Sequence, residues 1–253
     1  MSVDRPLYRT MHQHVVDRIG VEVVSGSPPD GLTLEPEHIL AERLSVSRGA
    51  IREAVKALAA KGMVELRPRT GTRVLPRSKW NLLDHKVLSW MEQTDPESLI
   101  VHLTEVRRLI EPGAAELAAE RALTNETEAL SAAYHAMETA HREGHRDSFT
   151  AADIRFHHEL LRLTNNPLLI SLSSSLEVAL RATFETTSAA PGGIEATLPL
   201  HFQVADAVIH HRPALARSQM EVLIDTSARN FADVRALQRD GATFQDGRRS
   251  SAD

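Results

Sequence analysis

The strongest constraint on the fold of this chain is the stretch from Leu40 to Val74, LAERLSVSRGAIREAVKALAAKGMVELRPRTGTRV. Ser47 is a suitable helix N-cap, because its hydroxyl can accept a backbone N–H from the first turn of the helix that follows. Gly62 is suited to end that helix. The expected elements are a helix over about Glu37–Leu44, a tight turn at Ser45–Ser47, a helix over about Ser47–Lys61, and strands over Met63–Leu66 and Thr72–Leu75. With a preceding helix over about Tyr8–Val24, this order predicts a winged helix-turn-helix.

The second helix of this stretch has one apolar side and one basic side. Helical spacing places four apolar residues on one side, at Ile51, Ala54, Val55 and Leu58. On the other side, Ser47, Arg48 and Gly49 lie in the first turn, where a recognition helix meets base edges. Arg48 can make a bidentate contact to guanine, and Arg52 can reach a base or a phosphate. The pattern therefore favours double-stranded DNA as a partner.

The loop between the two expected strands is basic and rich in turn-forming residues, and reads Arg67-Pro68-Arg69-Thr70-Gly71. A wing of this kind can place Arg69, Thr70 and Gly71 on the DNA backbone or in a minor groove. The alternative is a helical hairpin followed by a β-hairpin whose arginines are simply solvated.

The charge of the chain is divided unevenly. Residues 38–80 hold ten Lys and Arg against three Asp and Glu, a net charge of +7. Residues 81–253 hold sixteen against twenty-five, a net charge of −9. A basic module beside an acidic body fits a protein that touches DNA with one end only.

The rest of the chain shows no strand-like alternation after Trp80. Hydrophobic residues make up 42% of the chain and aromatic residues only 4%, so the core must be aliphatic, which suits packed helices. Helices are expected over about 82–91, 96–121 with a bend at 111–113, 125–141, 146–164, 167–187, 195–210 and 213–238. The predicted fold class is therefore mainly α, with a winged helix-turn-helix of three helices and a β-hairpin, followed by an all-α antiparallel bundle of six to seven helices.

Length and composition add further limits. The 253 residues are enough for two compact domains, which we place at 1–76 and 83–238, with a linker at 77–82 and a polar, disordered tail at 239–253. There is no cysteine, so a disulfide framework and a thiolate metal site are excluded. No apolar run reaches membrane-spanning length and no signal peptide opens the chain, so we expect a cytoplasmic protein without a membrane partner.

The DNA-reading stretch resembles the GntR superfamily of winged-helix transcription regulators. The family pattern is an LA-x-x-L helix, then V-S-R, R-E-A-x-x-x-L and a G-T wing. It is present here as Leu40-Ala41, Leu44, Val46-Ser47-Arg48, Arg52-Glu53-Ala54, Leu58 and Gly71-Thr72. One departure is the segment Glu35-Pro36-Glu37-His38, where the family usually has Pro-Ser-Glu-Arg. His38 replaces an arginine that touches DNA in many members, so a DNA contact from His38 would depend on pH.

The helical remainder resembles the FadR-type ligand-binding domain, known as the FCD domain. Its signature is present as Glu105-Val106-Arg107 with Glu111-Pro112, Ala152-Asp153-x-x-Phe156-His157, and Asn166-Pro167. The combined resemblance covers about Tyr8 to Arg235. It implies a homodimer whose helical domain binds a small effector. The segments Trp80–Asp84 and Ala182–Glu185 resemble, more narrowly, members that control sugar-acid operons.

The resemblance also implies a metal site, because the family's pocket often holds a divalent metal on one Asp and three His. Asp153 and His157 match two of these ligands and lie four apart on one helix side, and His201 matches another. The remaining histidine would fall at Leu223, which cannot bind a metal. The site is therefore incomplete, and zinc, nickel and manganese are all compatible with its ligand types. Alternatively, these side chains hydrogen-bond a sugar acid or each other.

A carboxylate effector needs a cation in the pocket. Arg107 matches the family's pocket arginine and could bind the acid bidentately. Arg181 is a second candidate, and Thr197, four residues before His201, could bond a ligand hydroxyl. The alternatives are surface ion pairs, of Arg107 with Glu105 or Glu111 and of Arg181 with Glu177 or Glu185.

The resemblance and the residues together predict a ligand-responsive transcription regulator, most simply a repressor. It would bind a palindromic operator as a homodimer and be released by a sugar acid such as galactonate or gluconate, or by a lactate-like or dicarboxylic acid. A second hypothesis is a hydrolase that uses a metal-bound water on Asp153, His157 and His201. No general base is evident, so no catalytic residue is assigned. A third is a constitutive architectural DNA binder without an effector.

Overall fold

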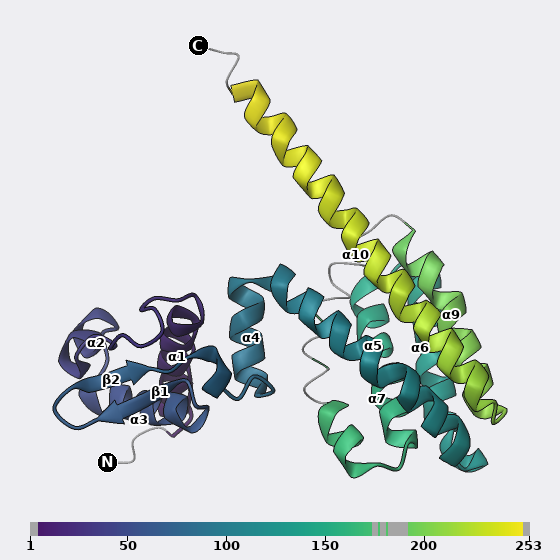
Figure 1. The fold of residues 1–253 in the computed structure, drawn as a ribbon, viewed down its shortest axis with the longest axis horizontal. Coiled ribbons are helices and arrows are strands. Elements are labelled where there is room, and N and C mark those ends of the chain that lie inside the picture. The colour runs from purple at the N-terminus through teal and green to yellow at the C-terminus, as the bar shows by residue number, and fades with distance from the viewer. Residues whose placement is uncertain (1–4, 174–176, 178–180, 182–191, 250–253) are drawn as a thin grey trace. The chain divides into compact units, whose positions relative to one another are not determined.

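The structure, a computed structural model, describes residues 5–173, 177, 181 and 192–249, and most of these residues are helical (Figure 1). The chain divides into two compact units, Met1–Leu99 and Ile100–Asp253. Each unit has its own hydrophobic core, so each is described separately.

The first unit is a three-helix core with a small hairpin and one additional helix. Its elements are α1 (Arg5–Val24), α2 (Glu37–Arg43), α3 (Arg48–Ala60), β1 (Val64–Arg67), β2 (Gly71–Val74), a 3₁₀ turn at Arg77–Lys79, and α4 (His85–Thr94). The apolar side of α3 is buried as its spacing predicts, and it packs against Val15, Val16 and Ile19 of α1. The expected winged helix-turn-helix is therefore confirmed.

Two local signals in the sequence set the beginning and the end of α3. Ser47 caps α3, and its hydroxyl accepts the N–H of Ala50 at 3.2 Å. At the other end, Gly62 has a φ of +72°, and the N–H of Met63 bonds the carbonyl of Leu58 at 3.1 Å. This arrangement is a glycine C-cap, and it turns the chain directly into β1. The hairpin then pairs Val64 with Val74 and Arg67 with Gly71 in antiparallel register.

The helix α4 packs within the first unit, whereas the sequence analysis placed residues from 83 onward in the second domain. Trp90 of α4 is buried against α1, and a side chain at Gly20 would put its Cβ 2.7 Å from the Trp90 ring. Trp90 Nε1 also donates to Asp17 at 3.0 Å, and Lys86 pairs with the same carboxylate at 2.9 Å. The reason for the difference is that an apolar helix face does not reveal, from sequence alone, which neighbour it packs against.

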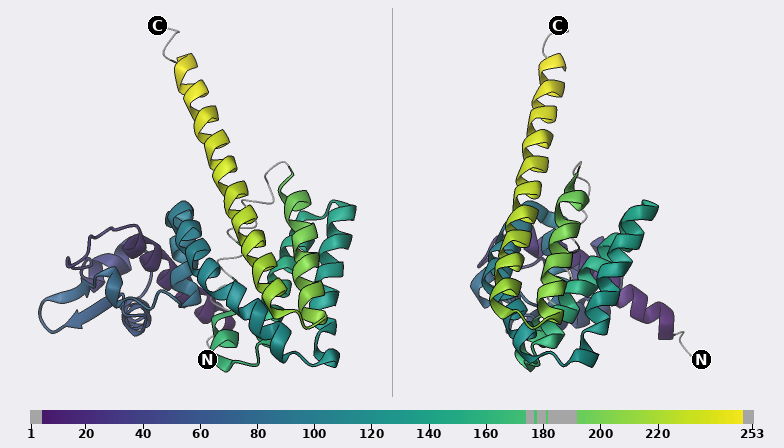
Figure 2. Two further views of the ribbon diagram at one scale, coloured as in Figure 1. Left: turned by 45° about the vertical axis from the view of Figure 1, so that its right-hand side comes forward. Right: turned by 90° about the vertical axis from the view of Figure 1, so that its right-hand side faces the viewer.

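The second unit is an antiparallel helical bundle. Its elements are α5 (Pro96–Arg121, which starts at the end of the first unit), a 3₁₀ turn at Thr124–Glu126, α6 (Glu128–Glu143), α7 (Arg146–Leu163), α9 (Gly193–Ile209) and α10 (Pro213–Arg249). Residues 167–173 are helical as well. The helices α6 and α7 pack together, as do α9 and α10 (Figure 2). Ion pairs Arg108–Asp225 and Glu116–Arg217 show that α5 and α10 run in opposite directions.

The core of this unit is aliphatic, as the low aromatic content predicts. Small residues of α5 and larger residues of the other helices fill it, including Ala115, Ala118, Leu130, Met137, Phe156, Leu160, Val204, Met220 and Leu223. The predicted mainly α fold class is confirmed.

The helix α5 has the bounds that the sequence predicts, and Pro112 lies inside it. One detail differs from the sequence analysis. The helix α10 continues to Arg249, over most of the segment for which we expected disorder, and no proline interrupts the chain after Pro213. The segment Ala182–Glu185 lies outside the described residues, as does part of the helix expected at 167–187. Within the described ranges, no helix is both long and apolar enough to cross a membrane.

Replacing Gly62 with alanine should destabilise the first unit. The new Cβ would lie 2.3 Å from the backbone oxygen of Lys79, in addition to the cost of a positive φ for a residue with a side chain. Gly26 is the matched control, because its φ is +81° but nothing lies within 4 Å of its Cβ position. In chemical denaturation, Gly62→Ala should lose at least about 1 kcal/mol more than Gly26→Ala. Equal losses would show that the contact with Lys79 relaxes freely.

Replacing Asp84 with alanine should destabilise α4 in a pH-dependent way. Burial raises the pKa of Asp84, but the bonds to Lys61 and to the N–H groups of Val87 and Lys86 outweigh it and lower the pKa below its usual value near 3.8. The stabilisation is therefore present above about pH 4 and is lost as pH falls through the lowered value. Asp84→Ala should cost about 1 kcal/mol at pH 7 and less at pH 3. Urea denaturation at both pH values measures this, with Asp30→Ala, an exposed position, as the control.

Candidate functional site

A groove of about 580 Å³ lies in the first unit between α3, the segment before α2, and the hairpin. Six of the residues predicted to touch DNA line it, namely His38, Arg48, Arg52, Arg69, Thr70 and Gly71. The other two, Ser47 and Gly49, are exposed in the first turn of α3, next to Arg48. The structure therefore gathers all eight residues on one surface. The helix α3 and the antiparallel hairpin bring them together.

The groove is mainly basic. Arg48, Arg52, Arg67 and Arg69 all line it, although Glu35 and Glu37 lie there as well. Arg52 pairs with Glu37 at 2.7 Å and keeps 64% of its side chain exposed, so Glu37 holds the guanidinium in place without burying it. Arg67 and Glu37 also line this surface, although neither was predicted to touch DNA.

The tip of the hairpin contains an unfavourable backbone conformation. Arg69 has a φ of +66°, in the left-handed region that a residue with a side chain adopts at a cost of roughly 1 kcal/mol. Gly71, two residues later, has a φ of +92° and takes this conformation without cost. The turn therefore carries an exposed arginine at a position where a glycine would make the turn more stable.

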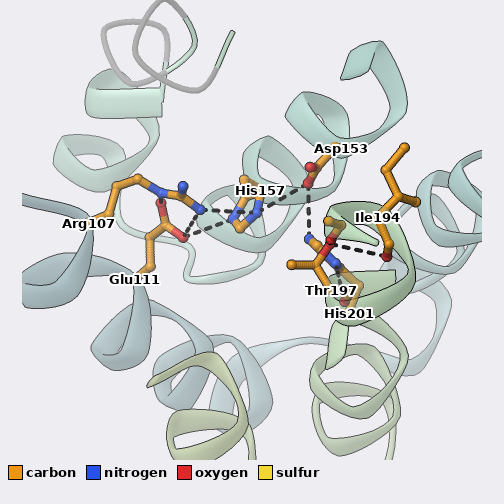
Figure 3. Close-up of polar contacts among 8 residues, drawn as sticks. Arg107, Glu111, Asp153, His157, Ile194, Thr197 and His201 are labelled. Carbon is orange, nitrogen blue, oxygen red and sulfur yellow. Dashed lines mark hydrogen bonds and ion pairs between the residues drawn. The ribbon is translucent and has the colours of Figure 1, made fainter. Parts of the chain in front are cut away.

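A second group of polar residues is buried inside the helical unit (Figure 3). Arg107 and Glu111 come from α5, Asp153 and His157 from α7, and His201 from α9. All five are at least 98% buried. Buried charges of this kind need partners, and the structure supplies them in a chain that crosses three helices.

This series of polar contacts begins with a buried ion pair on α5. Arg107 Nε donates to Glu111 Oε1 at 2.7 Å, and Glu111 Oε2 lies 2.9 Å from Nδ1 of His157. Arg107 Nη2 also approaches His157 Nε2 at 3.4 Å, which is long for a hydrogen bond. Arg107 thus pairs with Glu111, one of the two partners considered in the sequence analysis, but inside the bundle and not at the surface.

The series of polar contacts continues to α9 through the carboxylate of Asp153, which both histidines share. Asp153 Oδ1 lies 3.3 Å from Nε2 of His157 and 3.0 Å from Nε2 of His201. His201 Nδ1 lies 2.9 Å from the backbone oxygen of Thr197, so this nitrogen carries the proton that the carbonyl accepts. The Thr197 hydroxyl donates within its own helix, to Gly193 and Ile194. Thr197 therefore meets the cluster through its carbonyl, and the predicted bond between Thr197 and a ligand hydroxyl stays a prediction.

Mutual pairing shifts the ionisation of this cluster. Burial raises the pKa of Glu111, but Arg107 and His157 outweigh it and lower the pKa to about 2. Burial likewise raises the pKa of Asp153, but the two histidines lower it well below its usual range. Burial lowers the pKa of His157, whereas Glu111 and Asp153 raise it, and the net shift is upward. Both carboxylates are therefore charged at neutral pH.

The residues Asp153, His157 and His201 could together hold a metal ion. One ligand atom from each lies within 4.8 Å of the others, and all three residues are buried. Asp153 Oδ1 and His201 Nε2 are close, yet neither has an aligned hydrogen bond within the described part of the chain. Two buried polar atoms that point into the same space without bonding each other fit a shared ligand. Leu223, at the position of the family's third histidine, is fully buried in the apolar core.

A pocket of about 320 Å³ reaches this cluster from outside. His157 lines it, together with Arg155, His158, Ser173, Glu177 and Arg181. Arg181 is half exposed and lies 3.5 Å from Glu177, so it has the ion pair considered in the sequence analysis and also faces a pocket. Arg181 and His157 therefore line the same pocket, whereas the lining does not include Arg107, Asp153, Thr197 or His201.

Glu111 is the member of the cluster that the sequence analysis did not assign to the site. Its spacing of four from Arg107 on a helix was visible, and an arginine and a glutamate at that spacing commonly pair. The sequence could not show that the pair is buried, because the helix α5 has no clear polar side.

Two family models match the chain. The model for bacterial regulatory proteins of the gntR family matches residues 11–74, and the model for the FCD domain matches residues 102–226. These ranges contain the groove and the buried cluster, respectively.

Individual relatives agree with these models. The galactonate operon transcriptional repressor of Escherichia coli (strain K12) is 33% identical over 222 residues, which cover 87% of this chain and 96% of that protein. The uncharacterized HTH-type transcriptional regulator YieP of the same organism is 33% identical over 196 residues, 77% of this chain and 84% of that protein. A solved structure of Lar, described as controlling the Listeria monocytogenes agr system, has a TM-score of 0.61 at 17% identity, and covers 87% of this chain and 96% of that one. This last match supports the fold alone.

Proposed function

Since this chain belongs to the gntR family of bacterial regulatory proteins and carries an FCD domain, we propose that it represses a sugar-acid catabolic operon and is released from its operator by a small carboxylate. It is a DNA-binding transcriptional regulator, and its domains and relatives are regulators and not enzymes. The hydrolase considered from the sequence is therefore set aside. The sugar acid, the repression and the operator symmetry are the parts that we propose.

The basic groove supports the DNA-binding part of the proposal. Arg48 stands exposed at the start of α3, where a recognition helix inserts into the major groove, and it can pair with guanine through two N–H groups. Arg69 and Thr70, at the tip of the hairpin, would contact the backbone or the minor groove. We propose a homodimer on a palindromic operator, because two recognition helices must contact half-sites about one helical turn apart.

The buried cluster is the single observation that carries the effector part of the proposal. A buried arginine, two charged carboxylates and two histidines are expensive to fold and add little stability compared with apolar residues of similar size. A pocket that reaches His157 and carries Arg181 gives a small molecule access to this group. A sugar acid offers the matching chemistry, since its carboxylate suits an arginine and its hydroxyls suit imidazole and carboxylate groups.

We propose that a divalent metal takes part in effector binding. Asp153, His157 and His201 would hold it, and the metal would supply a Lewis-acidic site for effector oxygens. With Leu223 in place of a further histidine, the protein supplies three ligands, so effector oxygens or water would complete the coordination. Zinc, nickel and manganese all match these ligand types.

The helix α5 provides a route for regulation. It carries both Arg107 and Glu111, and it follows α4 after a single residue, Asp95. An effector that draws Arg107 away from Glu111 would act on this helix directly. The change in operator affinity would be about 1–3 kcal/mol, or roughly 5- to 150-fold, as is typical of allosteric coupling.

Replacing Arg48 with alanine should sharply lower selectivity for the operator over random DNA. Loss of a bidentate contact to a base typically costs about 1–3 kcal/mol at that position. Lys56→Ala is the control, because Lys56 is exposed on the same helix but does not line the groove, so its loss should affect binding to both DNAs equally. Competition binding at fixed salt measures the ratio. Unchanged selectivity in Arg48→Ala would mean that α3 does not read the operator through this residue.

Galactonate should weaken operator binding. The measurement is fluorescence anisotropy with DNA from upstream of the protein's own gene, at fixed salt, with and without galactonate. We expect a rise in Kd of roughly 5- to 150-fold. Tight binding that is indifferent to galactonate would overturn this effector, and gluconate, lactate-like and dicarboxylic acids would then be compared. Tight binding unaffected by any of these acids would favour a constitutive DNA binder.

A further inference from the structure

We propose that Glu111 is a positioning residue that prepares His157 for metal binding and, at the same time, keeps Arg107 away from the metal position. The proposal rests on the metal-binding part of the proposed function. It adds a role for a residue that lies outside the three candidate ligands.

Both histidines direct Nδ1 toward an oxygen atom, His201 in an aligned hydrogen bond and His157 in an ion-pair contact. His201 Nδ1 lies 2.9 Å from the backbone oxygen of Thr197, and His157 Nδ1 lies 2.9 Å from Glu111 Oε2. Each Nδ1 therefore faces an oxygen acceptor, which favours a proton on that nitrogen. The lone pair of a neutral ring is then left on Nε2 in both residues. A histidine that binds a metal through one nitrogen usually donates its other N–H to a carboxylate or a carbonyl, as here.

Both Nε2 atoms face the same carboxylate. Nε2 of His157 and Nε2 of His201 lie 3.3 Å and 3.0 Å from Asp153 Oδ1. The two rings are nearly perpendicular, with centroids 5.5 Å apart, so they do not stack on each other. Their Nε2 lone pairs converge on one position beside Asp153. Figure 3 shows this convergence from α7 and α9, with Glu111 on the opposite side of the His157 ring.

Glu111 has a second effect through Arg107. Arg107 Nη2 lies 3.4 Å from the same Nε2 of His157 that would bind a metal. Glu111 holds the guanidinium much more tightly, at 2.7 Å between Nε and Oε1. Without the Glu111 carboxylate, Arg107 would shift toward Asp153 and His157, which are its nearest other groups in the cluster. Its positive charge would then oppose a metal ion at that position.

The simpler alternative is that Glu111 only neutralises a buried arginine. That role requires the contact between Arg107 and Glu111 but no particular state of His157. The two roles differ in what happens at the metal site when Glu111 changes, and in where the His157 proton lies when a metal is bound.

The first test is cobalt(II) binding to the full-length protein without DNA or effector, followed by the visible absorption of the bound ion. The variants are Glu111→Gln and the control Glu116→Gln, which alters an exposed carboxylate on the same helix, paired with Arg217 at 2.8 Å. We expect Glu111→Gln to bind cobalt(II) about 10- to 100-fold more weakly than the unchanged protein, the usual effect of removing such a partner. Glu116→Gln should bind as the unchanged protein does. A folded Glu111→Gln variant with unaltered cobalt(II) affinity and absorption would overturn the proposal.

The second test needs no variant, which matters because Glu111→Gln leaves a buried guanidinium without its carboxylate. Histidine labelled with ¹⁵N is incorporated into the unchanged protein, and its ring nitrogens are recorded by NMR with and without zinc. We expect His157 to keep a protonated Nδ1 and to bind zinc through Nε2. Zinc bound through Nδ1, or no zinc bound at all, would overturn the proposal.

These outcomes are independent of operator binding. If cobalt(II) and zinc behave as expected but galactonate does not release the operator, the role of Glu111 stands and the proposed effector fails. If galactonate releases the operator while metal binding is absent, the proposed regulation stands and the role of Glu111 fails.

Discussion

The buried ion pair between Arg107 and Glu111 is the interaction on which the interior of the helical unit depends. A guanidinium removed from water must be paired, and an unpaired charge in this position would cost several kcal/mol. Glu111 supplies that partner from one turn further along α5, and its second oxygen extends the pairing to His157 on α7. The same chain reaches His201 on α9 through Asp153. Three helices are therefore held in one mutual arrangement by charge as well as by apolar packing.

In this bundle, one set of residues stabilises the fold and another set is available to contact a ligand. The apolar core, built around small residues of α5 and larger residues of α6, α7, α9 and α10, stabilises the fold. The polar chain contributes less to stability but gives the interior a set of groups that a charged or hydroxylated molecule can engage. Leu223, where the family resemblance would place a further histidine, is instead fully buried in the apolar core.

In the first unit the charged residues lie on the surface, whereas in the second unit the polar cluster is buried. The charged residues of the first unit are exposed along a groove, and a small core holds the elements that carry them. Close contacts make that core rigid, since Gly20 lets the Trp90 ring lie against α1 and Gly62 lets the end of α3 approach Lys79. A surface that reads DNA needs this rigidity, because hydrogen bonds to base edges require side chains that start from fixed backbone positions.

The sequence by itself determined the order of helices and strands in the first unit, the winged helix-turn-helix and the mainly α class, because helical spacing, the cap at Ser47 and the glycine at Gly62 are local signals. It also supplied the residue types of both sites through their resemblance to a family. Only the tertiary structure decided that α4 packs with the first unit, that Glu37 holds Arg52, and that Arg107 and Glu111 are buried with His157. These contacts join residues far apart in the chain, or depend on which side of a helix faces inward. Neither property can be read from local spacing alone, because it is set by the packing of all the helices together.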